Sequence, residues 1–185
     1  MSNQVNSTKV VTGKVRFCYV NVFEPTAMNE GDTPKYNICI LIPKDDAKTL
    51  DKINKAVEAA KQAGKAKLAD KNGKIPSNLK LPLRDGDDER ADDPAFENCY
   101  FINANSNRKP SIVDRDLNPI MEKEEFYSGC YGRASINFYA FNVTSKGIAA
   151  GLNNLQKLED GEMLAGGSTA EEDFGGENAF DDELM

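Results

Sequence analysis

The residues of this chain with the most evident binding chemistry are aromatic side chains that alternate with basic and amide side chains in β-prone segments. Near the N-terminus, Lys14 and Arg16 alternate with Val15, Phe17 and Tyr19. Later in the chain, one set of alternate positions is aromatic, cationic and amide in character: Tyr127, Tyr131, Arg133, Asn137 and Tyr139. The intervening positions of this later segment carry ordinary core residues. The set that contains Tyr131 and Arg133 is too polar for a core and too aromatic for a plain surface.

Such a face suits an extended polyanion that carries flat rings, because aromatic side chains stack on bases while guanidinium and amide groups hold phosphates. Stacking contributes about 1–3 kcal/mol per base, so three or four rings are enough for micromolar binding or better. We expect Lys35, Arg108 and Lys109 to add positive charge to this surface. The alternative is that the rings fill a barrel or form a protein–protein interface.

The charge distribution also indicates a polyanionic partner. The net charge is −7, yet ten acidic residues and no Lys or Arg lie between Glu159 and Met185, and seven more acids crowd into Asp85–Glu97 around Arg90. The rest of the chain is basic. Charge asymmetry of this kind predicts that the acidic tail competes with the polyanion for the basic body.

Enzymatic chemistry finds little support in the composition. The chain has no histidine, which removes the commonest general base and metal ligand. No phosphate-binding loop, serine elbow or dinucleotide fingerprint is present. Asp114, Asp116, Asn118 and Glu125 imitate a calcium loop, but Pro119 stands where that loop requires glycine, so a hairpin turn is the better interpretation. We expect a non-enzymatic protein without metal or cofactor. A magnesium-dependent nuclease that uses the acidic loop is the weaker alternative.

Four cysteines are expected to be reduced, buried and small apolar residues, because none forms a Cys-x-x-Cys pair. A zinc site built from separate strands is the less favoured interpretation. They are Cys18, Cys39, Cys99 and Cys130.

The sequence predicts one β-rich domain over residues 9–158. One helix is expected from a cap at Asp45 to Ala63, with Gly64 as its stop, since its apolar residues recur at helical spacing. Residues 65–97 are expected to form a long loop, and residues 1–8 and 159–185 to be disordered. The expected strands are Val10–Phe23, Lys35–Ile42, Asn98–Asn105, Ser111–Asp114, Ile120–Glu122, Phe126–Val143 and Gly147–Leu158. A small barrel with one helix in a crossover fits this order best.

Several runs together resemble the single-stranded DNA-binding proteins of tailed bacteriophages. These runs are VVTGKVRFCYVNVFEP, KYNICILIPKDD, LPLRDGDDER, YSGCYGRASINFYAF and KGIAAGLNNLQKLEDGE. They occur in the family order and span about Val10 to Leu164. The resemblance implies an OB-fold, sequence-independent binding of single-stranded DNA, and a role in phage replication, recombination and repair.

The resemblance also implies that the acidic tail contacts replication or recombination proteins. The residues expected to do so are Phe174, Phe180, Asp181, Asp182 and Glu183. The tail ends in Leu184-Met185 rather than in an aromatic residue, which departs from the tails of some relatives. Neither a secretory signal nor a membrane span is expected, so the protein is expected in the cytoplasm of the bacterial host, as a monomer or homodimer. An adaptor or structural virion component is the alternative function.

Overall fold

The computed structural model describes residues 7–27 and 30–164. Most of the predicted acidic tail, including Phe174, Phe180 and Asp181 to Glu183, lies outside the described residues, as do residues 1–6. The first part of that tail, residues 159–164, is described and packs against the body. Within the described ranges, no helix is long and apolar enough to cross a membrane.

Five strands close into a barrel: β2 (Val15–Thr26), β3 (Lys35–Pro43), β5 (Cys99–Ser106), β7 (Tyr131–Asn142) and β8 (Lys146–Glu159). Strand β3 pairs with β2 and β5 in antiparallel fashion, β5 pairs with β8 in parallel, and β7 pairs with both β8 and β2. This connectivity is that of an OB-type barrel. The mainly β fold predicted from the sequence is therefore confirmed.

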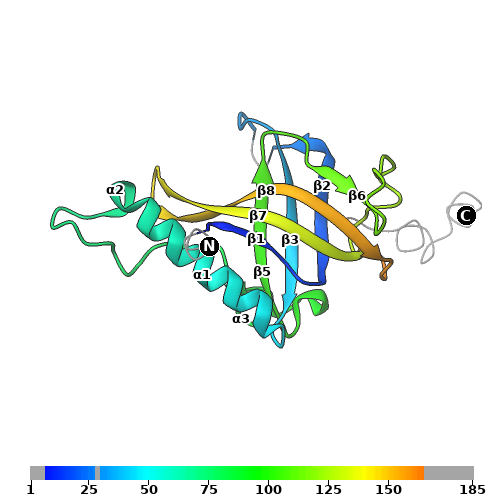
Figure 1. The fold of residues 1–185 in the computed structure, drawn as a ribbon, viewed down its shortest axis with the longest axis horizontal. Coiled ribbons are helices and arrows are strands. Elements are labelled where there is room, and N and C mark those ends of the chain that lie inside the picture. Colours follow the sequence, from blue (N-terminus) through cyan, green and yellow to red (C-terminus); the bar gives the residue numbers. More distant parts are fainter. Residues whose placement is uncertain (1–6, 28–29, 165–185) are drawn as a thin grey trace, which may run out of the picture.

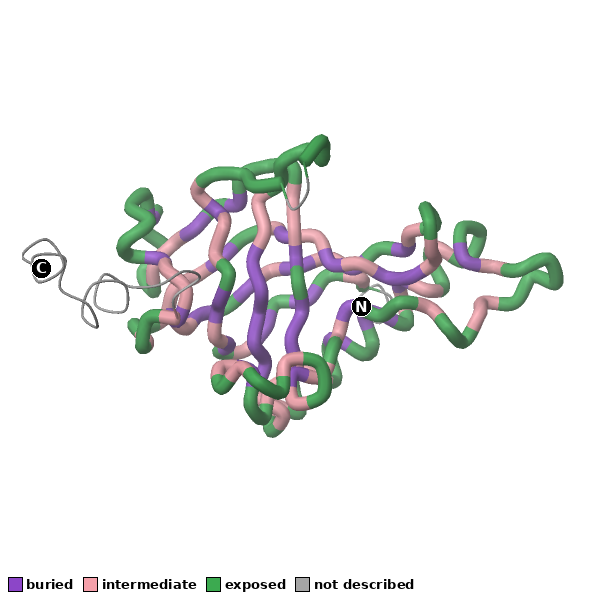
Figure 2. Tube along the Cα trace, turned by 180° about the vertical axis from the view of Figure 1, so that it is seen from behind, coloured by how far each residue is buried: buried purple, intermediate pink, exposed green. Residues whose placement is uncertain are grey.

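Three shorter strands extend the sheet at its edges: β1 (Lys9–Val11) beside β7, β6 (Ser111–Val113) beside β8, and β4 (Arg84–Asp85) beside β5. In Figure 1, β2, β3 and β5 stand side by side while the long β7–β8 hairpin crosses them. Figure 2 shows that buried residues concentrate in the middle of the strands and that exposed ones concentrate in the connections.

The barrel interior is filled by the apolar half of each alternating strand. Phe17 on β2 and Ile136 and Phe138 on β7 are almost completely buried. Phe17 packs against Phe126 with ring centroids 5.1 Å apart. Burial of a side chain of this size contributes about 1.5–3 kcal/mol, so these residues hold the barrel together.

One long helix, α1 (Ala47–Ala63), covers part of β7, β1 and β8, as its buried stripe of Ile53, Ala56, Val57 and Ala60 requires. Its N-cap is Asp46, whose side chain accepts a hydrogen bond from the Thr49 amide, so the expected cap at Asp45 is wrong by one residue. Gly64 ends the helix as expected. A Cβ at this position would lie 2.3 Å from the Ala140 side chain, so glycine is also required by packing.

The connection from α1 to β5 was expected to be a long loop. It contains four short elements: α2 (Lys65–Leu68), β4, α3 (Gly86–Glu89) and the 3₁₀-helix η2 (Pro94–Phe96).

Four other expectations differ from the structure. The stretch Val10–Phe23 is two strands, because the chain turns between β1 and β2. Strand β7 starts at Tyr131 rather than Phe126, since Gly129 has a φ of +116° that interrupts extended structure. Ile120–Glu122 is not a strand and is represented only by a bridge between Val113 and Pro119. Cys99 is half-buried, whereas the other three cysteines are buried.

Substitution of Gly132 with alanine is expected to destabilise the protein. Gly132 lies where β7 contacts both β2 and β8, and a Cβ would meet the Gln156 carbonyl oxygen at 1.9 Å and the Phe17 ring at 3.0 Å. Overpacking of this kind costs about 1–3 kcal/mol. Urea unfolding measures the change.

The matched control is Gly151→Ala on β8, where the nearest atom to the added Cβ is 3.5 Å away. Equal losses of stability in the two variants would contradict the role assigned to Gly132.

Candidate nucleic-acid interface

The outer face of β2, β3 and β5 carries rows of side chains that point away from the barrel core. Arg16, Leu41 and Phe101 form one row by strand register, and Cys18, Cys39 and Asn103 form the next. A third row comprises Asn21, Asn37 and Asn105. The face is therefore cationic at one end, apolar in the middle and rich in amides at the other end.

Tyr19 reaches this face because β2 is irregular. The register between β2 and β3 shifts after Cys18, and Tyr19 has a φ of +48°, which is rare for a residue with a large side chain. Simple alternation would place Tyr19 with the buried Val15 and Phe17. The bulge instead leaves its side chain 44% exposed on the outer face.

An acidic strap, residues 84–97, crosses the outer face. Phe96 anchors it by packing edge-on against Phe101, with ring centroids 5.1 Å apart, in a small cluster that includes Cys18, Cys39 and Leu41. Contact with Cys18 and then burial raise the pKa of the Cys39 thiol, so this residue stays protonated. The cysteines at the centre of the face are therefore packing residues.

Arg90, the single base of the strap's acidic run, links the strap to β2. Its guanidinium lies 5.4 Å from the centroid of the Tyr19 ring and 4.8 Å from that of Phe96, and it donates a hydrogen bond to the Tyr19 hydroxyl. Stacking of a cation on an aromatic face is favourable, so this contact holds the strap against the sheet.

The start of the strap is tied to the end of β3 by Lys44, whose ammonium lies 2.8 Å from Asp85 Oδ1 and 2.7 Å from Asp87 Oδ2. The hydrogen bonds to Asp85 and then to Asp87 raise the pKa of Lys44, and each carboxyl in turn has a lowered pKa because of Lys44. All three groups are therefore charged near neutral pH.

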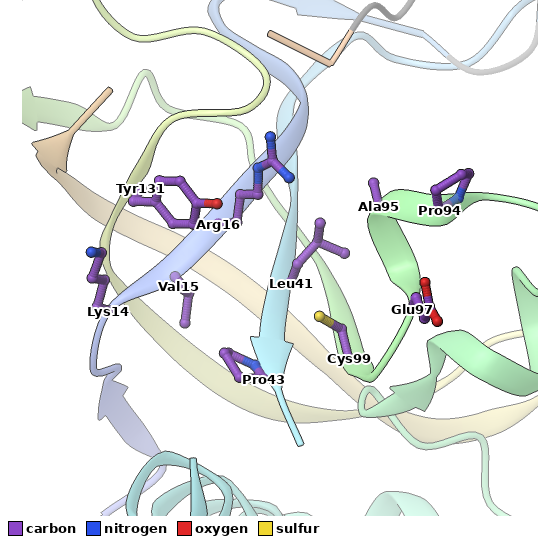
Figure 3. Close-up of a pocket in the computed structure, with 10 residues that line it drawn as sticks. All are labelled: Lys14, Val15, Arg16, Leu41, Pro43, Pro94, Ala95, Glu97, Cys99 and Tyr131. Carbon is purple, nitrogen blue, oxygen red and sulfur yellow. The ribbon is translucent and has the colours of Figure 1, made fainter. Parts of the chain in front are cut away.

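A first depression, the cationic cavity, has a volume of about 370 Å³ and is lined by Lys14, Arg16, Tyr131, Leu41 and residues of the strap. Figure 3 shows Tyr131, Lys14 and Arg16 on one side of it and Pro94, Ala95 and Glu97 on the other. Lys14 and Arg16 lie 5.2 and 5.3 Å from the centroid of the Tyr131 ring. Two cations and one ring at this spacing provide both phosphate contacts and a stacking surface.

A second depression, the amide cavity, has a volume of about 830 Å³ at the other end of the same face. Its most notable lining residues are Tyr19, Asn21, Lys35, Asn37, Asn103 and Asn105. Tyr19 and Arg90 border this cavity on the side of the strap.

The first residues of the predicted tail occupy the edge of the cationic cavity. Lys14 pairs with Glu159, and Arg16 donates hydrogen bonds to the carbonyl oxygens of Gly129 at 3.1 Å and Glu162 at 2.7 Å. Leu164 packs against the small cluster beneath the strap. The cations predicted to bind a polyanion are thus already in contact with the chain's own acidic segment.

Tyr127 lies before β7 and not on the strand face predicted for it. Its hydroxyl donates to Asp160 and Gly161, while the Lys157 ammonium lies 2.6 Å from Asp160 Oδ1. Hydrogen bonds from Lys157 and then from Tyr127 lower the pKa of Asp160. Tyr127 therefore holds the path of residues 159–164.

Apart from Tyr127, the predicted site residues lie in three places. Lys14, Arg16, Tyr19, Tyr131 and Lys35 line the two cavities. Arg108 and Lys109 follow the end of β5, where the Lys109 ammonium lies 5.5 Å from the centroid of the Phe23 ring. Farther along β7, and lining neither cavity, are Arg133, Asn137 and Tyr139.

Arg133 and Asn137 have structural partners near β1. Arg133 donates to the Thr12 carbonyl oxygen, and Asn137 accepts from the Thr8 hydroxyl. Asp114 also has a local role, because its carboxylate accepts from the Asp116 and Asn118 amides and forms a turn.

Sequence reasoning missed Arg90 and the four asparagines. In the sequence Arg90 is simply the one base within an acidic run, and nothing local signals its contact with Tyr19. The pattern Asn103-Ala104-Asn105 on a predicted strand does place two amides on one face, and this signal was available.

These features define a class of protein. In OB-type barrels, the second and third barrel strands, here β3 and β5, bind oligonucleotides or oligosaccharides, and the cationic and aromatic groups on this face favour a nucleic acid. The sequence pattern of a family described as "Enterobacter phage Enc34, ssDNA-binding protein" matches residues 8–185. The chain belongs to this family.

Individual proteins show the same relationship. The single-stranded DNA-binding protein of bacteriophage Enc34, solved in complex with single-stranded DNA, is 26% identical, with a TM-score of 0.73 over 85% of this chain and 90% of that chain. "Putative protein p50" of Acyrthosiphon pisum secondary endosymbiont phage 1 is 28% identical over 88% of this chain and 89% of that protein. The fold is also similar to that of gp2.5, a single-stranded DNA-binding protein encoded by bacteriophage T7, with 13% identity and a TM-score of 0.61 over 87% of this chain and 97% of that chain.

Replacement of Lys44 with methionine is expected to loosen the acidic strap. Both ion pairs are lost, and two carboxylates of lowered pKa are left without their cation. Hydrogen exchange of residues 84–97 should become several-fold faster near neutral pH, as mass spectrometry can measure. Lys55→Met, which removes an exposed pair with Asp51 on α1, is the control.

Acid should remove the difference between the wild type and Lys44→Met. The lowered pKa values mean that the ion pairs stabilise the strap above the ordinary carboxyl pKa of about 4 and are lost as pH falls through the lower values of the folded protein. Strap exchange that is unaffected by Lys44→Met at pH 7 would overturn this assignment.

Proposed function

We propose that this protein binds single-stranded DNA without regard to sequence, by laying the strand across the outer face of β2, β3 and β5. The observation that carries the proposal is the cationic cavity, where Lys14 and Arg16 flank the Tyr131 ring. Membership in a family of phage single-stranded DNA-binding proteins supports it, as does a 26% identical relative solved with single-stranded DNA.

The dimensions of the face suit such a ligand. Strand β3 has nine residues and spans about 26 Å at about 3.3 Å per residue step. Single OB-type barrels bind about 4–16 nucleotides, so the two cavities lie within one binding site of ordinary length. The contacts are rings, ammonium and guanidinium groups and amides, which every base and phosphate can satisfy.

We further propose that the protein works in the infected bacterial cell and supports phage DNA replication, recombination and repair. Coating of exposed single strands is needed wherever a duplex is opened. The acidic tail, with Phe174 and Phe180 among its acids, would contact proteins that act on the same DNA. Removal of the tail should then abolish co-purification of such proteins while DNA binding persists.

The tail is also proposed to compete with DNA. The contacts of Lys14 with Glu159 and of Arg16 with Glu162 bring residues 159–164 to the edge of the cationic cavity. The remaining tail, residues 165–185, carries seven more acids and no Lys or Arg. A polyanion tethered at this point has a high effective concentration at the DNA site.

Replacement of Tyr131 with leucine should weaken oligo-dT binding by about 1–3 kcal/mol without changing its salt dependence, because one stacking surface is lost. Lys14→Met should instead lower the slope of log K against log salt by about 0.7, the value for one phosphate contact. Fluorescence anisotropy titrations at several salt concentrations measure both effects.

Tyr139→Leu is the matched control, since Tyr139 is an exposed tyrosine of the same strand that lines neither cavity. If Tyr139→Leu weakens oligo-dT binding as much as Tyr131→Leu does, the binding site includes the other part of β7 and the assignment to the cationic cavity is wrong. Absence of oligo-dT binding in the wild type would favour an adaptor or virion role instead.

Deletion of residues 165–185 should tighten oligo-dT binding several-fold at low salt and have little effect at high salt, where the tail's charges are screened. This deletion keeps residues 159–164, whose contacts belong to the folded body. A full-length variant with all seven tail acids changed to amides should behave like the deletion. Equal or weaker binding by both proteins would contradict competition by the tail.

A further inference from the structure

The amide cavity has a different chemistry from the cationic cavity. Asn21 on β2 and Asn37 on β3 are paired neighbours across the two strands and line the cavity together. Asn103 and Asn105 on β5 line the next part of its wall. Asparagine is thus the commonest residue type in the wall of this depression of about 830 Å³. The charged residues of its wall include Asp32 as well as Lys35 and Arg90, so cations do not line it alone.

Hydrogen bonds fix one side of this cavity and leave the other side available. Asn21 donates to Asn37 at 3.0 Å, and Asn37 donates to the Thr26 hydroxyl at 2.9 Å. This chain of bonds orients both amides. In the part of the chain that the structure describes, the side chains of Asn103 and Asn105 form no hydrogen bond, so their donors and acceptors can serve a ligand.

We propose that the amide cavity is a pocket for a nucleobase of the bound DNA strand. A side-chain amide offers both a donor and an acceptor, as the hydrogen-bonding edge of a base does, whereas a phosphate offers acceptors alone. Because an amide can rotate to present either group, the pocket accepts different bases and remains compatible with sequence-independent binding.

Tyr19 provides the aromatic surface of this pocket. It lines the amide cavity, and its ring is held by Arg90 at 5.4 Å and by the hydrogen bond from Arg90 to its hydroxyl. A ring that is already fixed loses little freedom when a base stacks on it. The strand therefore meets two unlike subsites: one for phosphate and stacking beside Tyr131, and one for base edges beside Tyr19.

The inference rests on the proposed function, and the double variant Asn103→Leu/Asn105→Leu tests it. Binding is measured by anisotropy with oligo-dT and with an abasic oligonucleotide of the same length. The double variant should bind oligo-dT about tenfold more weakly than the wild type, the loss expected for one or two hydrogen bonds. Binding of the abasic strand should be unchanged. The salt slope should also be unchanged, since neutral contacts release no counterions.

Asn154→Leu, an exposed asparagine on β8 outside both cavities, is the matched control, and thermal unfolding checks that the variants fold. If the double variant binds oligo-dT as tightly as the wild type, the base-pocket proposal is wrong. It is also wrong if the variant loses as much affinity for the abasic strand as for oligo-dT. In both cases the proposed function still stands. If the wild type binds neither oligonucleotide, the proposed function fails, and the base pocket fails with it.

Discussion

Closure of the barrel through β7 is the constraint on which the rest of this structure depends. Strand β7 pairs with β8 along its length and with β2 at Gly132 and Tyr131, so it joins the two ends of the sheet. The closed barrel buries Phe17, Ile136 and Phe138 on the inside. Since the inner face supplies the stability, the outer face of β2, β3 and β5 is free to carry asparagines, cations and an irregular Tyr19.

The same closure places the cations of the site. The pairing of Arg16 with Tyr131 across β2 and β7 is the reason why a guanidinium, an ammonium and an aromatic ring meet at one point. Strand β8 ends beside this point, at the pairing of Tyr131 with Glu159. The chain that continues from Glu159 must therefore pass the cationic cavity. Proximity of the acidic segment to the site is thus a consequence of topology and needs no separate docking surface.

The sequence predicted those parts of the fold that depend on local pattern. Alternation identified the core face of β7, helical spacing identified α1, and glycine marked its end. It did not reveal that Phe126 turns back against Phe17 before β7 begins, because that contact is tertiary. Nor did it reveal how Tyr19, a predicted ligand contact, reaches the outer face, because a bulge reverses the alternation after Cys18. Two-residue periodicity cannot report where a strand departs from it.

For the site, residue type predicted the chemistry better than the location. Lys14, Arg16 and Tyr131 are predicted as ligand contacts from residue type alone, and the structure brings them together because Arg16 pairs with Tyr131 across β2 and β7. Tyr127, Arg133 and Tyr139 share residue types with Arg16 and Tyr131 but have other neighbours, and only three-dimensional packing separates the two groups. Arg90 and the four asparagines are the opposite case: they line the amide cavity but were not predicted, because contacts with residues distant in the sequence bring them there.

The acidic strap and residues 159–164 have a common physical effect on the outer face. Each already occupies a group that the proposed ligand needs: Arg90 of the strap stacks on Tyr19, the Glu159 carboxylate pairs with Lys14, and the Glu162 backbone carbonyl accepts from Arg16. A DNA strand that enters must exchange these contacts for its own phosphates and bases. The net free energy of DNA binding is therefore less favourable than the sum of the new contacts. It depends on salt through both the contacts that form and the internal contacts that break. Such an exchange favours a long polyanion, which replaces all the internal contacts at once, over small anions, which replace them singly.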